Sequence, residues 1–421
     1  MRPFTYRAVL VRAAAAFAVL AAVAACSDSL SSRAPAPGLI PAAAPRATPT
    51  PLSYVYVVNY NGNDIGQYAM DAQAKPPLKP IAPNFSLPST CTEPDSFVTA
   101  PHIGMAFVSC FSGEVVALQI KADHTLAATK IAPVPVPSPL SLLAPRAGAR
   151  DVLYATEYPG AVAELKYGKA SLKLEHTYPT NSQYPDEMAF YSSGGKSTLF
   201  VAAPFASAAC GSSSASGAVL PYAQTKRGGL TAEAPLPTCG SAYDVVVSGD
   251  YLYWAGPNVF GGYDVTRNAP LPSPSPPWPA NDGPSYYPNA VTNVHAPSKP
   301  KGATQSGGGM GYSGIFVGSN NGNGYVIDGR TGKSIDAFSL GTHFAIQAAQ
   351  CQFYANAVTV LGSRYQALCF TAEKDDVEFG GLPELKPSIN LRKLYTLKGD
   401  FPIDVHISDP CDDYEYYYYY C

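Results

Sequence analysis

The stretch SYVYVVNYNGNDIGQYAMD, residues 53–71, decides the fold, because its aromatic strand recurs along the chain. Six later segments repeat that pattern: MAFVSC, DVLYATEY, TLFVAA, YLYWAG, GIFVGS and YQALCF. The copies, aligned on Tyr56, Phe107, Tyr154, Phe200, Tyr253, Phe316 and Leu368, lie 51, 47, 46, 53, 63 and 52 residues apart. Short strands that recur at such a period predict an all-β fold, a seven-bladed β-propeller.

The last strand of the sequence is expected to close this propeller. The first repeat lacks an inner strand, because a proline-rich segment leads directly into Tyr54. FPIDVHIS, residues 401–408, resembles the inner strands PDSFVTA, PDEMAFY and YDVVVSG of other repeats. We therefore expect the propeller to span residues 53–408, with its C-terminal strand completing the first blade.

The N-terminal 25 residues read as a signal for export. Arg2, Arg7 and Arg12 precede an apolar run, Ala13 to Ala25, which is too short to span a membrane. The run ends in VAAC, which resembles the lipobox of bacterial lipoproteins, so Cys26 is the expected lipidation site. An ordinary signal peptide with an incidental cysteine is the alternative. We expect an exported protein, lipid-anchored to a bacterial membrane on its periplasmic or cell-surface side.

The segments that flank the propeller have unusual compositions. Residues 26–52 are rich in Pro, Ala, Ser and Thr without a helix or strand period, which is typical of a disordered tether. The C-terminal tail, residues 409–421, ends in CDDYEYYYYYC, Cys411 to Cys421, and is rich in tyrosine. The tail is expected to fold back on the propeller rim, and an aromatic platform for a glycan or peptide is the alternative.

Eight cysteines remain once Cys26 is assigned to a lipid, and an even number in an exported chain predicts disulfides. Cys91 precedes an inner strand and Cys110 ends the next strand, so antiparallel pairing brings them together. The same reasoning places Cys351 beside Cys369. We expect Cys210 to pair with Cys239 and Cys411 with Cys421. A metal site is disfavoured, because no CxxC pair or Cys/His cluster has zinc spacing.

Charge excludes one class of partner and leaves the others open. The net charge is −3 with 14% charged residues, and Lys and Arg form no stripe, so nucleic acid is not an expected partner. Standard catalytic signatures such as GxSxG and HExxH do not occur.

The most promising site residues come from the repeat. Six residues occupy nearly equivalent places where inner strands begin: Asp95, Asp186, Asp244, Asn289, Asn356 and Asp404. Inner strands surround the channel of a propeller, so these oxygens are expected to form a ring that binds a ligand or a hard cation such as calcium. The alternative is that Asp and Asn close turns by bonding their own backbone.

Two more residues are candidates for catalysis. Glu187 follows Asp186 directly, and paired carboxyl groups can raise one pKa into the range of a general base. His406 lies two residues after Asp404, on the same face of its strand. A histidine that is hydrogen-bonded between blades is the alternative for His406.

The first repeat is similar to the YVTN-type repeat of bacterial seven-bladed propellers, including the lactonase-like family. The matching residues are Tyr56, Val57, Asn59, Tyr60 and Gly62, and the resemblance extends in weaker form over residues 53–408. It implies the fold, and for function it implies a hydrolase in which calcium polarises a carbonyl or activates a water.

The sequence thus predicts a lipid-anchored, extracytoplasmic propeller that acts as a binding module for a protein, glycan or small molecule. A lactonase-type hydrolase with a channel-mouth site, with or without calcium, is the alternative. A wholly structural surface protein is also compatible with the composition.

Overall fold

The computed structural model describes residues 53–71, 74–145, 151–207, 216–256, 259–271, 288–295, 313–319, 323–328, 334–339, 348–360, 363–372, 376–382, 392–398 and 402–408. Beyond Leu271 only the backbone of the strands is described. All these residues belong to one compact unit, Pro49–Cys421. The predicted signal segment, the lipidation site Cys26, the tether and the tail 409–421 lie outside the described residues.

The described strands pair into seven antiparallel sheets, numbered here 1 to 7 in chain order. Sheet 1 contains β31 (Pro402–Ser408), β1 (Ser53–Asn59), β2 (Asp64–Met70) and β3 (Leu78–Pro80), with β4 (Phe85–Ser86) beside β2. Sheet 2 contains β5 (Pro94–Ala100), β6 (Met105–Cys110), β7 (Glu114–Ile120) and β8 (Leu126–Ala128), with β9 (Val134–Pro135) beside β7. Sheet 3 contains β10 (Pro139–Leu143), β11 (Val152–Glu157), β12 (Ala161–Gly168) and β13 (Ser171–Pro179).

The later sheets repeat this order. Sheet 4 contains β14 (Met188–Ser193), β15 (Lys196–Ser207), β16 (Ser216–Gln224) and β17 (Leu230–Ala232), with β18 (Leu236–Pro237) beside β16. Sheet 5 contains β19 (Asp244–Ser248), β20 (Tyr251–Gly256), β21 (Val259–Asp264) and β22 (Ala269–Pro270). Sheet 6 contains β23 (Pro288–His295), β24 (Ser313–Ser319), β25 (Asn323–Asp328) and β26 (Ser334–Ser339). Sheet 7 contains β27 (Ala348–Val360), β28 (Ser363–Ala372), β29 (Asp376–Leu382) and β30 (Arg392–Lys398).

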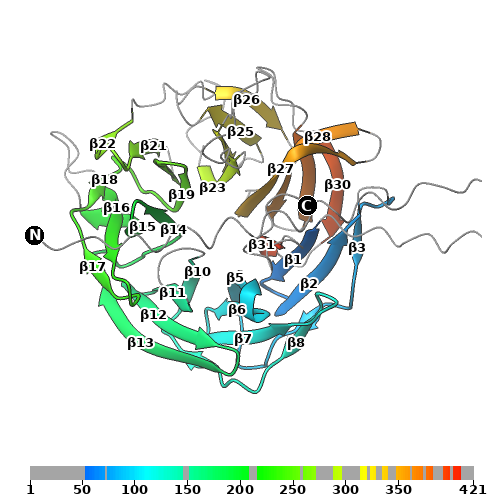
Figure 1. Ribbon diagram of the computed structural model, residues 1–421, viewed down its shortest axis with the longest axis horizontal. Coiled ribbons are helices and arrows are strands. Elements are labelled where there is room, and N and C mark those ends of the chain that lie inside the picture. The colour runs from blue at the N-terminus through cyan, green and yellow to red at the C-terminus, as the bar shows by residue number, and fades with distance from the viewer. Residues whose placement is uncertain are drawn as a thin grey trace, which may run out of the picture. The chain divides into compact units, whose positions relative to one another are not determined.

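Neighbouring sheets meet along their inner strands, by which we mean β31, β5, β10, β14, β19, β23 and β27 (Figure 1). Each inner strand contacts the inner strands of the sheets before and after it, and β31 contacts both β27 and β5. Four-stranded antiparallel sheets that meet in this way are consistent with a β-propeller. The prediction of an all-β fold is confirmed.

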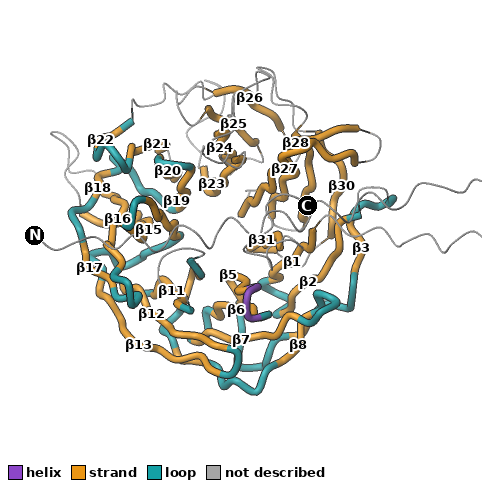
Figure 2. The backbone as a smooth tube through the Cα atoms, in the orientation of Figure 1, coloured by secondary structure: helices purple, strands orange, loops and turns teal. Residues whose placement is uncertain are grey.

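Helical structure is minimal in the part that the structure describes. It consists of one 3-10 turn, η1 (Pro101–Ile103), drawn in purple between strands in Figure 2. Within this part, no helix is long and apolar enough to cross a membrane.

The core lies between successive sheets. Successive residues of a strand point to opposite faces, so an apolar run such as VYVV contributes side chains to both neighbours. Tyr56 and Val58 pack against Phe97 of sheet 2, whereas Phe107 of sheet 2 packs against Leu153 of sheet 3. Equivalent clusters join sheet 3 to sheet 4 and sheet 4 to sheet 5.

The buried tyrosines of the repeat also form hydrogen bonds to the next sheet. The hydroxyl of Tyr56 donates to the carbonyl of His124, in the turn between β7 and β8, at 2.7 Å. The hydroxyl of Tyr154 donates to the carbonyl of Gly228, in the equivalent turn between β16 and β17. Both acceptor residues have positive φ, 61° for His124 and 103° for Gly228. The turn geometry thus supplies an acceptor for a phenol that is otherwise buried in apolar surroundings.

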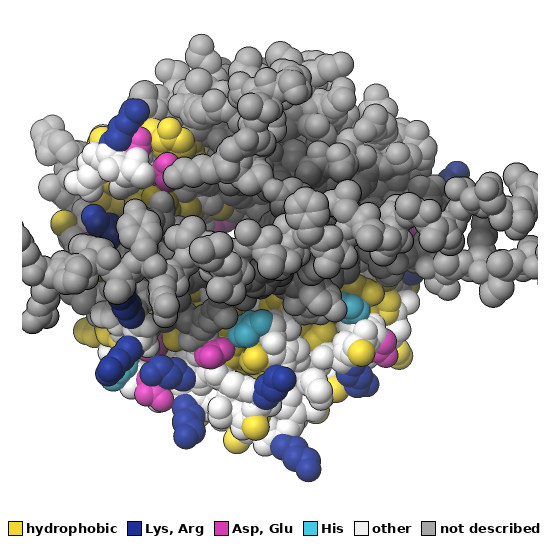
Figure 3. Space-filling model, viewed as in Figure 1, with side chains coloured by type: hydrophobic (Ala, Val, Ile, Leu, Met, Phe, Trp, Pro, Cys, Tyr) yellow, Lys and Arg dark blue, Asp and Glu magenta, His cyan; other side chains and the backbone are white. Residues whose placement is uncertain are grey.

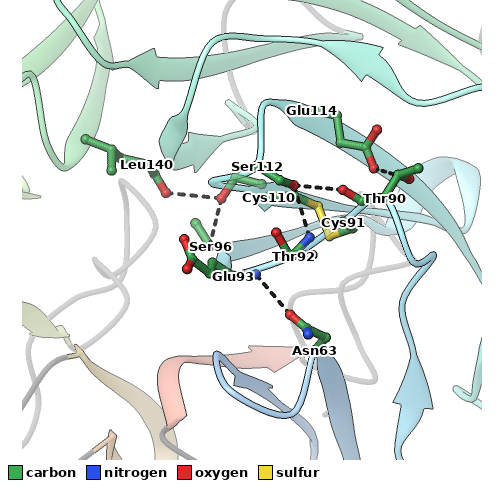
Figure 4. The surroundings of a disulfide bond; sticks show 11 residues. Asn63, Thr90, Cys91, Thr92, Glu93, Ser96, Cys110, Ser112, Glu114 and Leu140 are labelled. Atoms are coloured by element: carbon green, nitrogen blue, oxygen red, sulfur yellow. Dashed lines mark hydrogen bonds between the residues drawn. A yellow bond between two sulfur atoms is a disulfide. The ribbon is translucent and has the colours of Figure 1, made fainter.

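The disulfide between Cys91 and Cys110 confirms the predicted pairing. Its Cα atoms lie 5.1 Å apart and both residues are buried (Figure 4). It closes a loop with a sequence separation of 19, which in the chain-entropy model stabilises the fold by about 3 kcal/mol. Hydrogen bonds from Thr92 N to Ser112 Oγ and from Glu93 N to Asn63 Oδ1 add to this restraint. The segment that leads into β5 is therefore fixed on several sides.

The other predicted disulfides are described only in part. Cys239 is disulfide-bonded, and its predicted partner Cys210 lies outside the described residues. Cys351 stands directly opposite Cys369 in the register of β27 and β28, as the predicted bridge requires. Cys411 and Cys421 lie outside the described residues.

The pairing of β31 with β1 leads to a test by truncation. The register runs from Tyr54 opposite Ser408 to Asn59 opposite Pro402, so loss of β31 removes the neighbour of β1 along its whole length. We expect a chain that stops before Phe401 to unfold about 10 °C or more below the full chain, because β1 then becomes an unpaired edge. Circular dichroism melting measures this. A chain that stops after Ser408 keeps β31 and is the matched control; equal melting of the two truncated chains would contradict the prediction.

Candidate functional site

The strand register gives a common coordinate for all seven inner strands. In each sheet, the residue after the aligned aromatic residue stands opposite one inner-strand residue, which we call the reference residue. The reference residues are Val405, Phe97, Leu142, Met188, Val245, Val291 and Cys351 for sheets 1 to 7. We call the residues one position before them the first row and those two positions before them the second row.

The predicted ring divides between these two rows. Asp244 and Asp404 belong to the first row, and so does Glu187. The second row includes Asp95, Asp186 and Asn289. Asn356 belongs to neither row, because it follows Cys351 by five residues, where the register of β27 shifts. The first-row residue of sheet 7 is Gln350.

A proline directly precedes the second row in most of the sheets. It stands three residues before the reference residue in five of the seven sheets, as Pro94, Pro139, Pro185, Pro288 and Pro402. Four of these prolines begin their inner strand, where a missing N–H is tolerated. Counting from this proline separates the two rows and also identifies Ser96 and Ser141, first-row residues that the aromatic alignment left out.

The backbone of Asp186 and Glu187 is held by two sheets. The N–H of Asp186 donates to the carbonyl of Ala202 in β15 at 2.8 Å. The N–H of Glu187 donates to the carbonyl of Tyr243, which precedes β19 in sheet 5, at 3.2 Å. The two adjacent carboxyl groups are thus placed at the junction of sheets 4 and 5.

Glu187 also reaches the preceding sheet. The buried hydroxyl of Ser141 in β10 donates to Oε2 of Glu187 at 2.7 Å. Both residues are in the first row, so this contact shows that the row is continuous from sheet 3 to sheet 4. Burial raises the pKa of Glu187, and the hydrogen bonds from Ser141 and the Met188 N–H partly oppose that rise.

Asp186 lies among other carboxyl groups. Burial raises its pKa well above the usual range, and the negative charges of Glu187, Asp95 and Asp244 raise it further. Three of the six predicted ring residues, from sheets 2, 4 and 5, are therefore close enough to interact electrostatically. We call Asp95, Asp186, Glu187 and Asp244 the acidic cluster.

The structure does not bring these groups into a metal-binding geometry where it describes them. No group of three His, Cys, Asp or Glu residues in the described part could hold a metal ion. Asn289, Asp404 and His406 lie on described strands without described side chains, so the six-membered calcium ring stays a prediction. The backbone places His406 opposite Tyr56 in the pairing of β31 with β1.

A row of aromatic side chains borders the acidic cluster. The ring of Tyr184 lies 5.5 Å from that of Tyr158 and 6.3 Å from that of Phe205, and Phe205 lies 6.1 Å from Tyr243. We call these four residues the aromatic row. Tyr158 is 43% exposed and Phe205 is 52% exposed, so the row presents ring surface to solvent.

Tyr184 connects the aromatic row to the acidic cluster. Burial raises its pKa, and the charges of Asp186 and Asp95 raise it further, as do the neighbouring phenols of Tyr243 and Tyr158. Tyr60 of sheet 1 lies close as well, since its pKa is raised to about 12 by burial, by its hydrogen bond to Glu93 and by the charges of Glu93, Asp95 and Tyr184. Neither tyrosine was singled out from the sequence as a site residue, although Tyr60 belongs to the repeat and Tyr158 stands at the equivalent place after Tyr154.

One glycine permits this arrangement. Gly160, in the turn after Tyr158, has φ of +131°, and a Cβ there would collide with the carbonyl of Ser182. The N–H of Thr180 donates to the carbonyl of Gly160 at 2.9 Å. The segment that carries Tyr184 therefore packs directly on the turn that carries Tyr158.

Glu157, at the end of β11, is a buried acid that the sequence did not single out. It is 5% exposed, and its Oε1 has no hydrogen-bond partner. Burial raises the pKa of this carboxyl to about 7. It stands opposite Pro139, at the end of sheet 3 where the two rows lie.

The described surface carries scattered positive charge. In the view of Figure 3, Lys and Arg side chains lie along the lower and left parts of the described surface and form no continuous stripe.

Comparisons with known proteins support the fold. No protein-family model and no curated protein matches the sequence. The chain is similar in structure to a putative 6-phosphogluconolactonase from Bacteroides uniformis, with a TM-score of 0.55 and 11% identity over 84% of this chain and 99% of that one. A putative 6-phosphogluconolactonase from Bacteroides fragilis gives a TM-score of 0.55 and 11% identity, over 87% and 100%. Saccharomyces cerevisiae Sqt1 gives 0.52 and 10%, over 84% and 88%. At such identities the likeness concerns the fold alone.

Glu157 gives a pH-dependent prediction. The pKa of this carboxyl is higher in the folded than in the unfolded protein. The free energy of unfolding therefore falls as pH rises between the two values, from about 4.5 to about 7. The expected loss is about 3 kcal/mol. Glu157→Gln removes this charge, so the variant should gain stability over the wild type as pH rises from 5 to 8. Urea unfolding at both pH values measures the difference. Glu175→Gln, on the exposed strand β13, is the control, and a Glu157→Gln difference that stays constant with pH would contradict the prediction.

Proposed function

We propose that the chain is a seven-bladed β-propeller, closed by β31 and exported as a lipid-anchored protein, whose acidic cluster and aromatic row bind a ligand. Seven sheets in chain order and the pairing of β31 with β1 support the blade number and the closure. The lipobox-like VAAC before Ser27 supports the anchor.

The main support for the proposed binding function is that residues from several sheets lie around Glu187 and Asp186. Glu187 accepts a hydrogen bond from sheet 3, while Asp186 interacts with Asp95 of sheet 2 and Asp244 of sheet 5. Like charges that are gathered in a partly buried place disfavour ionisation of each other, and such perturbed groups concentrate at functional sites. The bordering rings of Tyr158 and Phe205 offer apolar contact surface to the same ligand.

A lactonase-type hydrolase is the second candidate. One observation favours it: the pKa of Glu187 is raised by burial, while Ser141 fixes the position of its carboxylate. Such a group can accept a proton from a water that attacks a lactone carbonyl. The acidic cluster would repel a phosphate group, so a neutral lactone suits this site better than a phosphorylated one.

Substitution of Glu187 distinguishes the two candidates. If the chain is a binding module, a panel of uncharged five- and six-membered lactones is not hydrolysed above the rate without protein, and Glu187→Gln changes nothing. Hydrolysis that falls about a hundredfold in Glu187→Gln, but persists in Glu175→Gln, would contradict the binding module and establish the hydrolase. A pH-indicator assay on the full chain measures these rates.

The lipid anchor has its own test. Cells that express the wild type and receive an alkyne-tagged fatty acid should label the protein, whereas Cys26→Ala should abolish labelling because it removes the acylated thiol. Cys239→Ala, at a cysteine that is disulfide-bonded, is the control and should keep the label. Equal labelling of wild type and Cys26→Ala would rule out the anchor.

A further inference from the structure

We propose that the aromatic row and the acidic cluster together form a binding site for a small organic cation of the alkylammonium type. This inference rests on the ligand-binding function proposed above and names the chemical class of the ligand. It combines two separate features of the described residues: exposed ring surface and neighbouring carboxyl groups, whose ionisation a bound cation favours.

The exposed ring surface is local. In the described part, the large hydrophobic side chains that are exposed are Tyr158, Leu174 and Phe205, and two of these three belong to the aromatic row. Scattered single apolar side chains are ordinary, whereas a continuous row of rings contributed by sheets 3, 4 and 5 forms a surface. Tyr158 and Phe205 both pack against Tyr184, at centroid distances of 5.5 and 6.3 Å, so the two exposed rings flank one tyrosine.

The electrostatic neighbours of Asp186, beside the row, are all acids. The described charged groups that act on Asp186 are Glu187, Asp95 and Asp244, all carboxyl groups. Tyr184 links the two features, because it contacts Tyr158 and Phe205 through its ring and interacts with Asp186 and Asp95 through its hydroxyl end. A ligand that lies on the rings therefore lies next to the acids.

These two features select among ligands. An anion is repelled by the carboxyl groups, and the described acids are not gathered closely enough to hold a metal ion. A neutral sugar would stack on the rings without using the charge. An alkylammonium ion uses both, since its charge is attracted to carboxylates and to aromatic faces while its methyl or methylene groups cover the rings.

Binding of choline, compared with its neutral isostere 3,3-dimethylbutan-1-ol, tests the inference on the full chain. We expect isothermal titration calorimetry to show choline binding at least about tenfold more tightly than the isostere, because the two differ chiefly in charge. Asp186→Asn and Phe205→Ser should each weaken choline binding about fivefold or more, since one removes a carboxyl group that a bound cation ionises and the other removes a ring. Leu174→Ser, which removes the exposed hydrophobic side chain outside the row, should leave affinity unchanged. Circular dichroism verifies that each variant is folded.

Other outcomes separate this inference from the proposed function. Equal affinity for choline and its isostere would contradict the inference that the ligand is an alkylammonium ion, but would leave the proposed binding site in place. Glucose or calcium binding that Phe205→Ser or Asp186→Asn removes, without choline binding, would do the same. If the folded wild type binds choline, its isostere, glucose and calcium equally poorly, with affinities weaker than about 10 mM, both the inference and the small-ligand function are wrong.

Discussion

The fold depends on contacts between neighbouring sheets. Two aligned tyrosines of the repeat, Tyr56 and Tyr154, are buried between two sheets, and their hydroxyls need acceptors there. Tyr56 and Tyr154 both find that acceptor in an outer turn of the following sheet, at a residue with positive φ. These two tyrosines therefore join sheet 1 to sheet 2 and sheet 3 to sheet 4. This dependence between sheets also places residues of sheets 2, 3, 4 and 5 around one carboxyl pair, although each sheet by itself offers only one or two polar side chains there.

Much of the fold was readable from the sequence, because period, turn chemistry and strand pairing are local or nearly so. The aligned repeat predicted the strands, and the blade plan predicted the bridge between Cys91 and Cys110. The six ring residues were harder to align, because an aromatic alignment ignores bulges. Register shifts occur where β5, β10 and β23 begin, between Pro94 and Phe97 in the first case. Asp244 lies one residue before its reference residue and Asp186 lies two before its own, so they belong to different rows although neither β14 nor β19 has a register shift.

The remaining site residues were not predicted from the sequence for another reason. Ser141 stands in the first row of sheet 3, where sheets 1, 4 and 5 have an acid, but its bond to Glu187 depends on how two sheets meet. Tyr184 and Phe205 become neighbours only when the segment before β14 packs on the turn at Gly160. Glu157 looked like any strand-ending acid until its burial was known. Contacts between sheets carry this information, and a single sequence contains no direct record of them.

The proline that stands three residues before the reference residue has a consequence for how this protein can change. The aligned repeats differ in spacing from 46 to 63 residues, yet that three-residue interval recurs in five sheets. Length variation is therefore absorbed by connecting loops, while the two rows keep their level on the inner strands. Insertions in those loops can accumulate without moving the carboxyl groups relative to one another. In such a fold the connecting segments can differ in length from sheet to sheet while the inner strands keep their polar residues at the same level.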